Sequence, residues 1–302
     1  MNSAAASGLT ARPPRPRVVL VDAVPMSALV AAVPAPRAVI VAIHGGATSS
    51  AYFDCPGHPE LSLLHAAAAQ GFTAIALDRP GYGSSAVYAN EFASPDRRVA
   101  AAAGAVDKIL ADSDRGAGLF LIGHSAGCEL ALRMATFRSD VIGIELAGTG
   151  LRYSESARSI ISEATMTSRP AGLRDLLWQP TDLYPTEVLT GALSAPGVAY
   201  EGEVTANWPR RDFPEIAARV RVPVEFSVAD HEQVWDCTPE ALAAVSALFT
   251  AAPRVRVNGV ADSGHNLSVG LAADRYHRSV MAFIEQCISG TYGRDPEEAE
   301  AG

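Results

Sequence analysis

The sequence is poor in lysine, in paired cysteines and in long apolar runs. Lys108 is the one lysine among 302 residues, and acidic residues outnumber basic ones by 33 to 24. Because binding to nucleic-acid phosphates needs clustered lysine and arginine, this balance argues against a nucleic-acid partner. No apolar run approaches the roughly 18 residues of a membrane span, so we expect no membrane partner either.

The cysteines give no sign of a metal site or a disulfide framework. None of Cys55, Cys128, Cys237 and Cys287 forms a C-x-x-C pair, and no cysteine–histidine spacing is typical of zinc. We therefore expect reduced thiols, no metal ion and no cofactor. Residues 1–16 lack the continuous apolar stretch of a signal peptide, so we expect a cytoplasmic protein. These residues and residues 290–302 are predicted to be disordered tails.

What the sequence does contain is an alternation of apolar β-branched runs with segments of helical pattern. The predicted parallel strands are residues 38–43, 72–77, 119–122, 141–146, 222–228 and 254–257, after an antiparallel opening pair within residues 18–33. Helices are expected at 61–69, 95–112, 126–137, from Pro239 onward and through 276–287. Ser94 is predicted to cap the second of these helices, and Thr238 the fourth. This order predicts the α/β class: a mostly parallel central sheet with helices on both faces.

One long segment interrupts the alternation. Residues 148–220 carry six prolines together with Trp178, Tyr184 and Trp208. A long insertion at one position of an α/β sheet usually covers the site, so we predict a helical lid there. The core would then consist of residues 17–147 and 221–289, and the three aromatic residues are predicted to contact the substrate.

The clearest motif is Gly123-His124-Ser125-Ala126-Gly127, which fits G-x-S-x-G. It follows an apolar strand and opens a helix, the setting in which a tight turn lifts a serine hydroxyl clear of a sheet. The two glycines would remove side chains that otherwise collide with neighbouring elements. Ser125 is therefore the predicted nucleophile.

A second small-residue loop, His44-Gly45-Gly46-Ala47, follows a buried strand. Backbone N–H groups on such a loop can bind the oxyanion of a tetrahedral intermediate. The predicted donors are the N–H groups of Gly46 and Ala126, with Ala47 as the alternative to Gly46. His44 and His124 are expected to hold loops by hydrogen bonds.

A serine hydroxyl needs a base, and His265 is the best-placed histidine because it follows the last strand and precedes the last helix. A carboxylate must orient that histidine. Asp230 and Glu232 follow the strand at 222–228, and Glu145 lies at the end of the strand before it. The residue pattern alone does not choose among these three acids.

From about Val18 to Ile288 the chain resembles the α/β-hydrolase superfamily. The matching pieces are His44-Gly45-Gly46, the segment Leu77 to Ser85 (LDRPGYGSS), Gly123 to Gly127, Asp230-His231-Glu232 and Gly264-His265, in the order nucleophile, acid, histidine. The resemblance favours Glu232 as the acid. Family members usually have Gly-x-x-Asp after that strand, whereas this chain has Ala229 and Glu232, so the longer acid places the loop differently.

With serine as nucleophile, the resemblance implies acyl transfer to Ser125 and then to water. The expected substrate is a carboxylic ester, a lactone or a thioester of a mainly apolar small molecule. An acyltransferase or a cofactor-free perhydrolase would use the same residues, and a non-catalytic small-molecule receptor on the same fold is the alternative from another class. The sequence leaves monomer and homodimer equally open.

Overall fold

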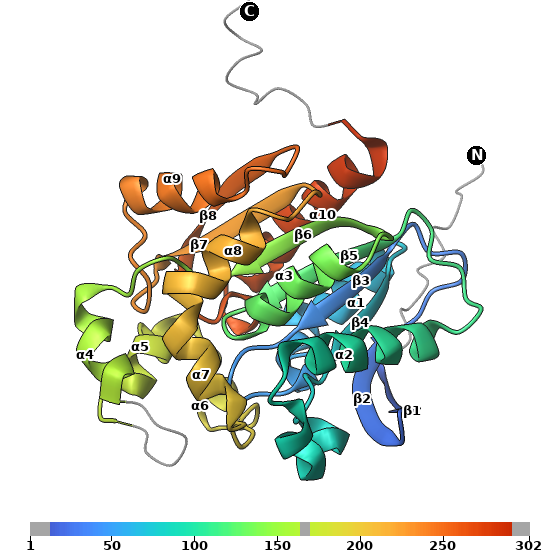
Figure 1. The fold of residues 1–302 in the computed structure, drawn as a ribbon, viewed down its shortest axis with the longest axis horizontal. Helices are drawn as coiled ribbons and strands as arrows, with labels where there is room; N and C mark the ends of the chain where they lie inside the picture. The colour runs from blue at the N-terminus through green and yellow to red at the C-terminus, as the bar shows by residue number, and fades with distance from the viewer. Residues whose placement is uncertain (1–12, 164–169, 292–302) are drawn as a thin grey trace, which may run out of the picture.

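The computed structural model describes residues 13–163 and 170–291, which are built around one eight-stranded sheet (Figure 1). Its spatial order is β1-β2-β4-β3-β5-β6-β7-β8. The strands are β1 (Arg15–Val21), β2 (Val24–Ala31), β3 (Val39–Ile43), β4 (Thr73–Leu77), β5 (Leu119–His124), β6 (Val141–Ala147), β7 (Val224–His231) and β8 (Val255–Gly264). The hairpin β1-β2 is antiparallel and joins β4 antiparallel, whereas β3 to β8 all run in parallel. The predicted fold class is confirmed.

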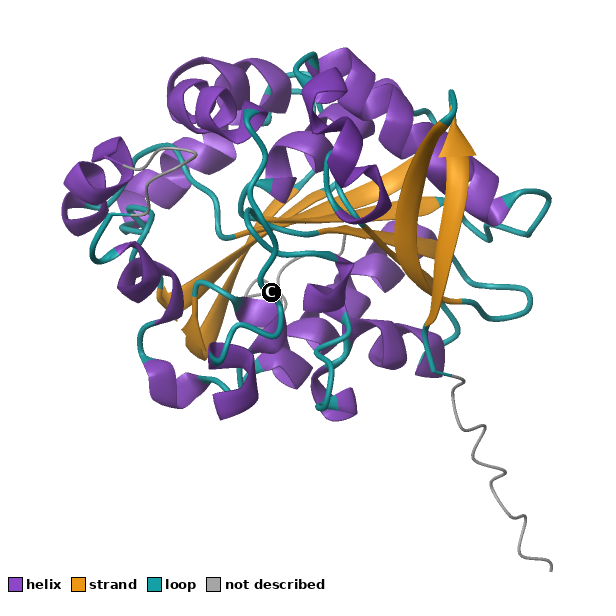
Figure 2. Ribbon diagram, turned by 90° about the horizontal axis from the view of Figure 1, so that it is seen from below, coloured by secondary structure: helices purple, strands orange, loops and turns teal. Residues whose placement is uncertain are grey.

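Helices cover both faces of this sheet (Figure 2). On one face lie α2 (Pro95–Leu110), α3 (Gly127–Phe137), α8 (Phe213–Ala217) and α9 (Pro239–Leu248), and on the other lie α1 (Leu63–Ala69) and α10 (Ala273–Ser289). Alternate residues of a strand feed the two cores, because successive side chains point to opposite faces. In β5, Leu119 and Leu121 join the first core while Phe120 and Ile122 join the second.

The helix starts are close to those predicted. Thr238 caps α9 by accepting a hydrogen bond from the Ala241 N–H at 3.4 Å. Ser94 stands at the start of α2, but its side chain makes no capping bond there, so that detail of the prediction is wrong. The last turn of α2 carries the exposed Lys108, which donates to the Leu20 carbonyl oxygen of β1.

Two stretches differ from the sequence-based expectation. β8 continues to Gly264 instead of ending at Val257, because it keeps pairing with β7 as far as His231↔Gly264. β1 begins at Arg15 and so includes two residues assigned to the N-terminal tail. The rest of both predicted tails, 1–12 and 292–302, lies outside the described residues.

Between β6 and β7 the chain forms mostly short helices. They are α4 (Glu155–Glu163), α5 (Leu173–Trp178), α6 (Thr186–Leu189), α7 (Tyr200–Asn207), a π turn (Trp208–Asp212) and α8, with a 3₁₀ turn at Thr181–Leu183. Further 3₁₀ turns are Ser50–Phe53, Pro59–Leu61, Gly83–Phe92 and Leu267–Val269. Helices α4 to α7 project from one end of the sheet, whereas α8 returns to pack against α3 (Figure 1).

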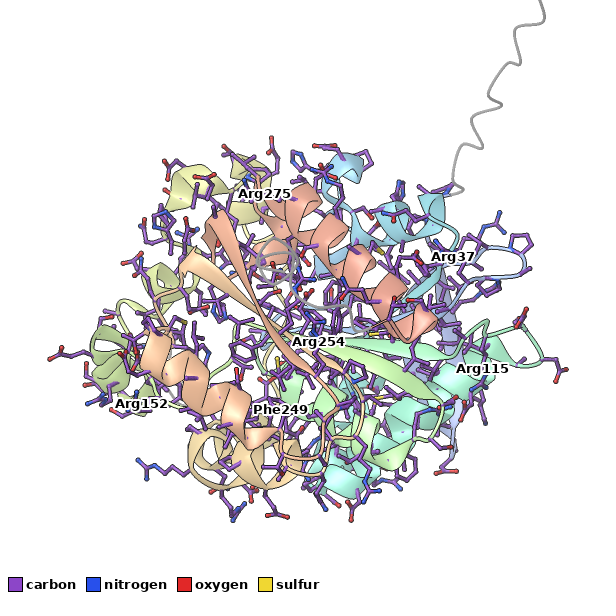
Figure 3. The ribbon with its side chains drawn as sticks, turned by 90° about the horizontal axis from the view of Figure 1, so that it is seen from above. Arg37, Arg115, Arg152, Phe249, Arg254 and Arg275 are labelled. Atoms are coloured by element: carbon purple, nitrogen blue, oxygen red, sulfur yellow. The ribbon has the colours of Figure 1, made fainter. Side chains whose placement is uncertain are left out.

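The exposed arginines are dispersed. Arg37, Arg115, Arg152 and Arg275 lie apart around the molecule (Figure 3). Each forms an ion pair with an acid, namely Glu285, Asp140, Asp236 and Asp262 respectively. Among the described residues, no helix combines the length and apolarity that crossing a membrane requires.

Candidate active site

Ser125 occupies a sharp turn between β5 and α3, at the centre of the sheet. Its φ of +49° lies in the left-handed region that a residue with a side chain avoids. The Ser125 N–H donates to the Ala147 carbonyl oxygen at the end of β6, over 2.8 Å, which helps to hold the turn. The hydroxyl is thereby placed at the carboxyl edge of the parallel strands, half-buried.

The two glycines of the motif are required by close approach. A Cβ on Gly123 would lie 2.8 Å from the Cα of Cys128, and one on Gly127 would lie 2.3 Å from the Ile43 carbonyl oxygen. Both contacts are with backbone, which cannot move aside as a flexible side chain could. The sequence pattern therefore follows from the packing of α3 against β3 and β5.

His265 follows β8 and lies between the two other predicted triad residues. Its Nε2 is 3.2 Å from the Ser125 Oγ, and its Nδ1 is 2.9 and 3.0 Å from the two oxygens of Glu232. A carboxylate only accepts hydrogen bonds, so Nδ1 carries the proton of the neutral ring and Nε2 is left to accept from the serine hydroxyl. This is the arrangement of a base that is oriented by an acid and aimed at a nucleophile.

Glu232 is reached by a turn at the end of β7. Its N–H donates to the Ala229 carbonyl oxygen at 3.2 Å, and its carboxylate also accepts from the Val234 N–H at 2.8 Å. The side chains of Glu232 and His265 are 3% and 1% exposed, so water does not compete for their contact. The longer side chain in place of the usual aspartate thus spans the gap to the histidine.

The other two acid candidates lie elsewhere. Asp230 accepts hydrogen bonds from the N–H groups of Asp262 and Ser263, at 2.9 and 3.0 Å, in the segment just before His265. Although partial burial acts to raise the pKa of Asp230, these two backbone donors lower it overall. Glu145 is fully buried inside the sheet, where its Oε1 accepts from the Tyr276 hydroxyl at 3.2 Å. Neither touches His265.

The loop that carries His265 is held from several sides. The His265 carbonyl oxygen accepts from His124 Nε2 at 3.0 Å, and the Tyr184 hydroxyl accepts from the Asn266 N–H at 3.2 Å. Gly148, with φ +66°, approaches so closely that a Cβ there would lie 3.0 Å from His265 Cε1. The histidine is thus fixed in position by packing and by backbone contacts.

Gly46 and Ala126 are the predicted oxyanion donors, and each lies in a loop that follows a parallel strand. Gly46 is exposed in the loop after β3, and Ala126 directly precedes α3. Within the part of the chain that the structure describes, neither backbone N–H has a hydrogen-bond partner in the protein. Ala47, the alternative donor, already donates its N–H to the Tyr82 hydroxyl at 3.1 Å. Their role in binding an oxyanion stays a prediction.

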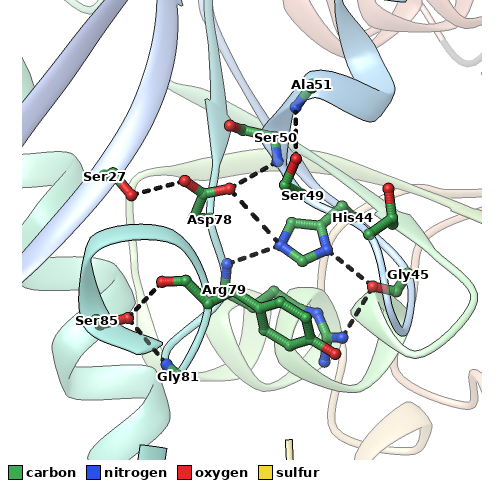
Figure 4. A network of polar contacts seen from close by, with 12 residues as sticks. Ser27, His44, Gly45, Ser49, Ser50, Ala51, Asp78, Arg79, Gly81 and Ser85 are labelled. Atoms are coloured by element: carbon green, nitrogen blue, oxygen red, sulfur yellow. Dashed lines mark hydrogen bonds and ion pairs between the residues drawn. The ribbon is translucent and has the colours of Figure 1, made fainter. Parts of the chain in front are cut away.

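His44 and His124 hold loops. His44 Nδ1 donates to the Gly45 carbonyl oxygen at 2.8 Å, and its Nε2 accepts from the Arg79 N–H at 3.1 Å (Figure 4). Burial lowers the pKa of His44 well below its usual range and that of His124 to about 3, so both rings are neutral at pH 7. The neutral His44 ring donates from Nδ1 and accepts at Nε2, while the neutral His124 ring donates from Nε2 to the His265 carbonyl oxygen.

A charged network beside the oxyanion loop was not predicted. The buried Arg79 donates to the Gly45 carbonyl oxygen at 2.9 Å and forms an ion pair with Glu201 of α7 (Figure 4 shows the first of these contacts). The Tyr82 hydroxyl also donates to Glu201, at 2.7 Å. Arg79 and Tyr82 stand in the segment Leu77 to Ser85, which carries part of the family resemblance. Glu201 lies more than a hundred residues later, and no sequence signal joins it to them.

The three aromatic residues predicted to contact substrate have different surroundings. Trp178 is half-buried, with its ring 5.2 Å from that of Tyr184. Tyr184 is buried and supports the histidine loop. Trp208 is buried as well, stacks on Phe213 and donates its Nε1–H to the Thr149 hydroxyl at 2.8 Å. Their contact with substrate stays a prediction, and Trp178 has the most exposed position of the three.

Comparison with known proteins was made on sequence and on fold. A sequence model of the alpha/beta hydrolase family matches residues 40–279. No curated protein gives a significant sequence match.

Solved structures with the same fold include a lactonase, an esterase and a thioesterase domain. The N-acyl homoserine lactonase AidH, complexed with N-hexanoyl homoserine, has a TM-score of 0.68 at 15% identity, over 91% of this chain and 97% of that one. An esterase from Exiguobacterium antarcticum has a TM-score of 0.62 at 14% identity, over 89% and 98%. The thioesterase domain from the curacin biosynthetic pathway has a TM-score of 0.58 at 20% identity, over 89% and 100%. At these identities the likeness shows the shared fold, and together with the family match over residues 40–279 it establishes that the chain belongs to the alpha/beta hydrolase family.

Proposed function

We propose that the protein is a serine hydrolase that cleaves a carboxylic ester, lactone or thioester through an acyl-enzyme on Ser125. The observation that carries this proposal is the unbroken series of contacts from Ser125 Oγ to His265 Nε2 and from His265 Nδ1 to Glu232. The three residues come from loops after three different strands, β5, β8 and β7, at one edge of the sheet.

The chemistry follows from that geometry. His265 takes the proton of Ser125 as the hydroxyl oxygen attacks the substrate carbonyl carbon, and Glu232 stabilises the resulting imidazolium. The N–H groups of Gly46 and Ala126 would bind the oxyanion of the tetrahedral intermediate. His265 then gives its proton to the leaving alcohol or thiol, and water repeats the sequence on the acyl-enzyme.

The proposed substrate is a mainly apolar small molecule. Residues 148–220 would act as the lid, with Trp178 as its most accessible aromatic side chain. Trp178 packs against Tyr184, whose hydroxyl holds the residue after His265, so an apolar group beside Trp178 would lie near the reacting atoms. Proteins of this fold include an esterase, a lactonase and a thioesterase domain, which supports acyl chemistry. They do not distinguish among the three substrate classes.

A paired assay tests the proposal. Wild type, Ser125→Ala and the exposed control Ser159→Ala would be treated with a fluorophosphonate, followed by intact mass, and assayed on p-nitrophenyl esters of short and medium chain. We expect one label and turnover in wild type and the control. Ser125→Ala should lose the label and fall in turnover by roughly 10⁵-fold or more, because triad members act as a unit.

The opposite results are equally informative. Equal turnover by wild type and Ser125→Ala would show that Ser125 is not the nucleophile. A folded wild type with neither label nor turnover would favour the non-catalytic receptor, and a ligand-binding screen would replace the ester assay.

A further inference from the structure

The loop that carries the predicted oxyanion donor Gly46 is built jointly with the insertion between β6 and β7. The Ala47 carbonyl oxygen accepts from the Ala195 N–H at 2.9 Å, and the Thr48 hydroxyl donates to the Leu193 carbonyl oxygen at 2.8 Å. The β3 strand ends at Ile43, so these contacts lie in the part of the loop that no neighbouring strand supports.

Tyr82 makes a third connection between the loop and the insertion. Its hydroxyl accepts from the Ala47 N–H at 3.1 Å and donates to Glu201 of α7 at 2.7 Å. The direction is fixed, because a backbone N–H only donates and a carboxylate only accepts. Burial raises the pKa of Tyr82 above its usual range, so the hydroxyl keeps its proton at any ordinary assay pH.

Ala47 needs such support. Its φ is +52°, in the left-handed region that alanine rarely adopts and that persists only where the surrounding contacts hold it. Both its N–H and its carbonyl oxygen are bonded, one through Tyr82 and one directly to Ala195. The Ala47 N–H belongs to the peptide between Gly46 and Ala47, and the Ala47 carbonyl oxygen belongs to the peptide between Ala47 and Thr48. Release of either bond lets the strained turn at Ala47 relax, which displaces the neighbouring Gly46 and its N–H donor.

The negative charge of Glu201 is balanced by Arg79. A Cβ on Gly46 would lie 3.6 Å from both Glu201 oxygens, so the carboxylate stands beside the residue that carries the predicted donor. A free anion there would repel the developing negative charge. Arg79 forms an ion pair with Glu201 and donates to the Gly45 carbonyl oxygen, which balances that charge and ties it to the same loop.

We propose that Glu201 is a positioning residue for the oxyanion loop and acts on Ala47 through Tyr82. The Gly46 donor is then in place only while residues 193–201 of the insertion are docked on the core. This inference rests on the proposed function, and it makes docking of the insertion and completion of the oxyanion hole a single event.

Steady-state kinetics of five variants provide the first test: Glu201→Ala, Glu201→Gln, Tyr82→Phe, the double variant Tyr82→Phe/Glu201→Ala, and Glu203→Gln. Loss of an oxyanion donor costs about 10² to 10³ in kcat, so its displacement should cost about ten- to a hundredfold, with KM changed by less than about threefold. We expect that loss in Glu201→Ala and Tyr82→Phe, and partial recovery in Glu201→Gln, whose amide oxygen still accepts from Tyr82. Glu203, exposed on the same helix, is the matched control and should be neutral.

The double variant separates action through Tyr82 from a general effect on the insertion. If Glu201 acts through Tyr82, the double variant should lie within about threefold of Tyr82→Phe, because contacting residues in one network are not additive. Losses that multiply would overturn the proposal, and so would Glu201→Ala and Tyr82→Phe variants that match Glu203→Gln.

Hydrogen exchange of the segment 44–50 tests the same proposal without catalysis. We expect faster exchange in Tyr82→Phe and Glu201→Ala than in wild type or Glu203→Gln, and unchanged exchange would overturn the proposal. If wild type turns over no ester at all, the proposed function fails, while the exchange result still decides whether Glu201 and Tyr82 position this loop.

Discussion

The acids at the end of β7 and the acids inside the sheet have opposite surroundings. Glu232 directly follows the strand and Asp230 is in its last two residues, where the pairing with β8 is irregular, and each carboxylate accepts at least one backbone N–H. Glu145 and Glu225 are paired in register across β6 and β7, in the interior of the sheet. There, Glu145 Oε2 and both oxygens of Glu225 are buried without a hydrogen bond in the described structure, although Arg256 Nε lies 3.1 Å from Glu225 as an ion pair.

The difference follows from which backbone N–H groups are free to donate to a carboxylate. Within a parallel sheet the neighbouring strands use the backbone N–H groups, so a buried acid has to find side-chain donors. Past the carboxyl end of a strand those N–H groups are free to bind a carboxylate. Burial therefore raises the pKa of Glu145 well above its usual range and that of Glu225 to about 7, while Asp230 is shifted downward. At the end of β7 the two backbone donors favour the ionised form of Asp230.

The largest effect should come from Glu232→Gln. With its oxygen on the Val234 N–H, the amide turns its N–H₂ group toward His265 Nδ1, so the ring proton moves to Nε2 and the base is lost. An equivalent loss in other triads lowers kcat by about 10⁴-fold. Steady-state ester hydrolysis measures this, with the exposed Glu240→Gln on α9 as control. A variant that keeps most of the wild-type kcat would remove Glu232 from the triad and undo the contrast between strand end and sheet interior.

Glu225→Gln should change the dependence of stability on pH instead of catalysis. The folded-state pKa of about 7 lies above the ordinary 4.5, so between these values the folded protein binds more protons than the unfolded chain, and stability falls as pH rises. The loss is complete above about pH 7 and amounts to about 3 kcal/mol for a shift of this size. The glutamine has no such loss, and the half-buried Arg256 can turn to water.

Urea unfolding at pH 5 and pH 8 measures this effect. Wild type and Glu225→Gln should differ little at pH 5, and the variant should be the more stable at pH 8. A difference of the same size at both pH values would show that Glu225 does not hold a proton in the sheet.

Asp230→Asn should have the smallest effect. The asparagine turns an N–H₂ group toward the Asp262 or Ser263 N–H and weakens one of the two bonds that place the segment before His265. We expect kcat to fall by about tenfold with KM nearly unchanged, because about 1.4 kcal/mol of positioning is lost. An Asp230→Asn variant that loses more than Glu232→Gln would mean that the acid of the triad is Asp230.

The sequence predicts the sheet well because buried parallel strands are continuous apolar runs, as at Val39–Ile43. It places the end of β8 too early because this edge strand has one neighbour and exposes residues such as Gly259 and Asp262, which also favour turns. Ser125 and His265 are found because their motifs and their positions after strands coincide. The choice of Glu232 depends on a turn at the end of β7 that residue spacing does not reveal.

The contacts of the insertion cannot be predicted from the sequence for a related reason. Glu201, Tyr184 and Trp208 each bind a partner that is distant along the chain, and their own neighbours in sequence show no strong periodicity. Tyr184 was predicted as a substrate contact from its aromatic ring, but in the structure its hydroxyl supports Asn266. Whether the ring also touches substrate stays a prediction.

The single lysine on α2 has a practical consequence. Helix α2 runs back from the carboxyl edge of the sheet, so Lys108 in its last turn lies toward the amino edge, near where residue 116 pairs with Ala38 before β3. Ser125 and His265 lie at the opposite edge. Apart from the α-amino group, an amine-directed reagent therefore has one side chain to react with. A dye or solid support coupled to Lys108 leaves the edge that carries Ser125 and His265 facing solution.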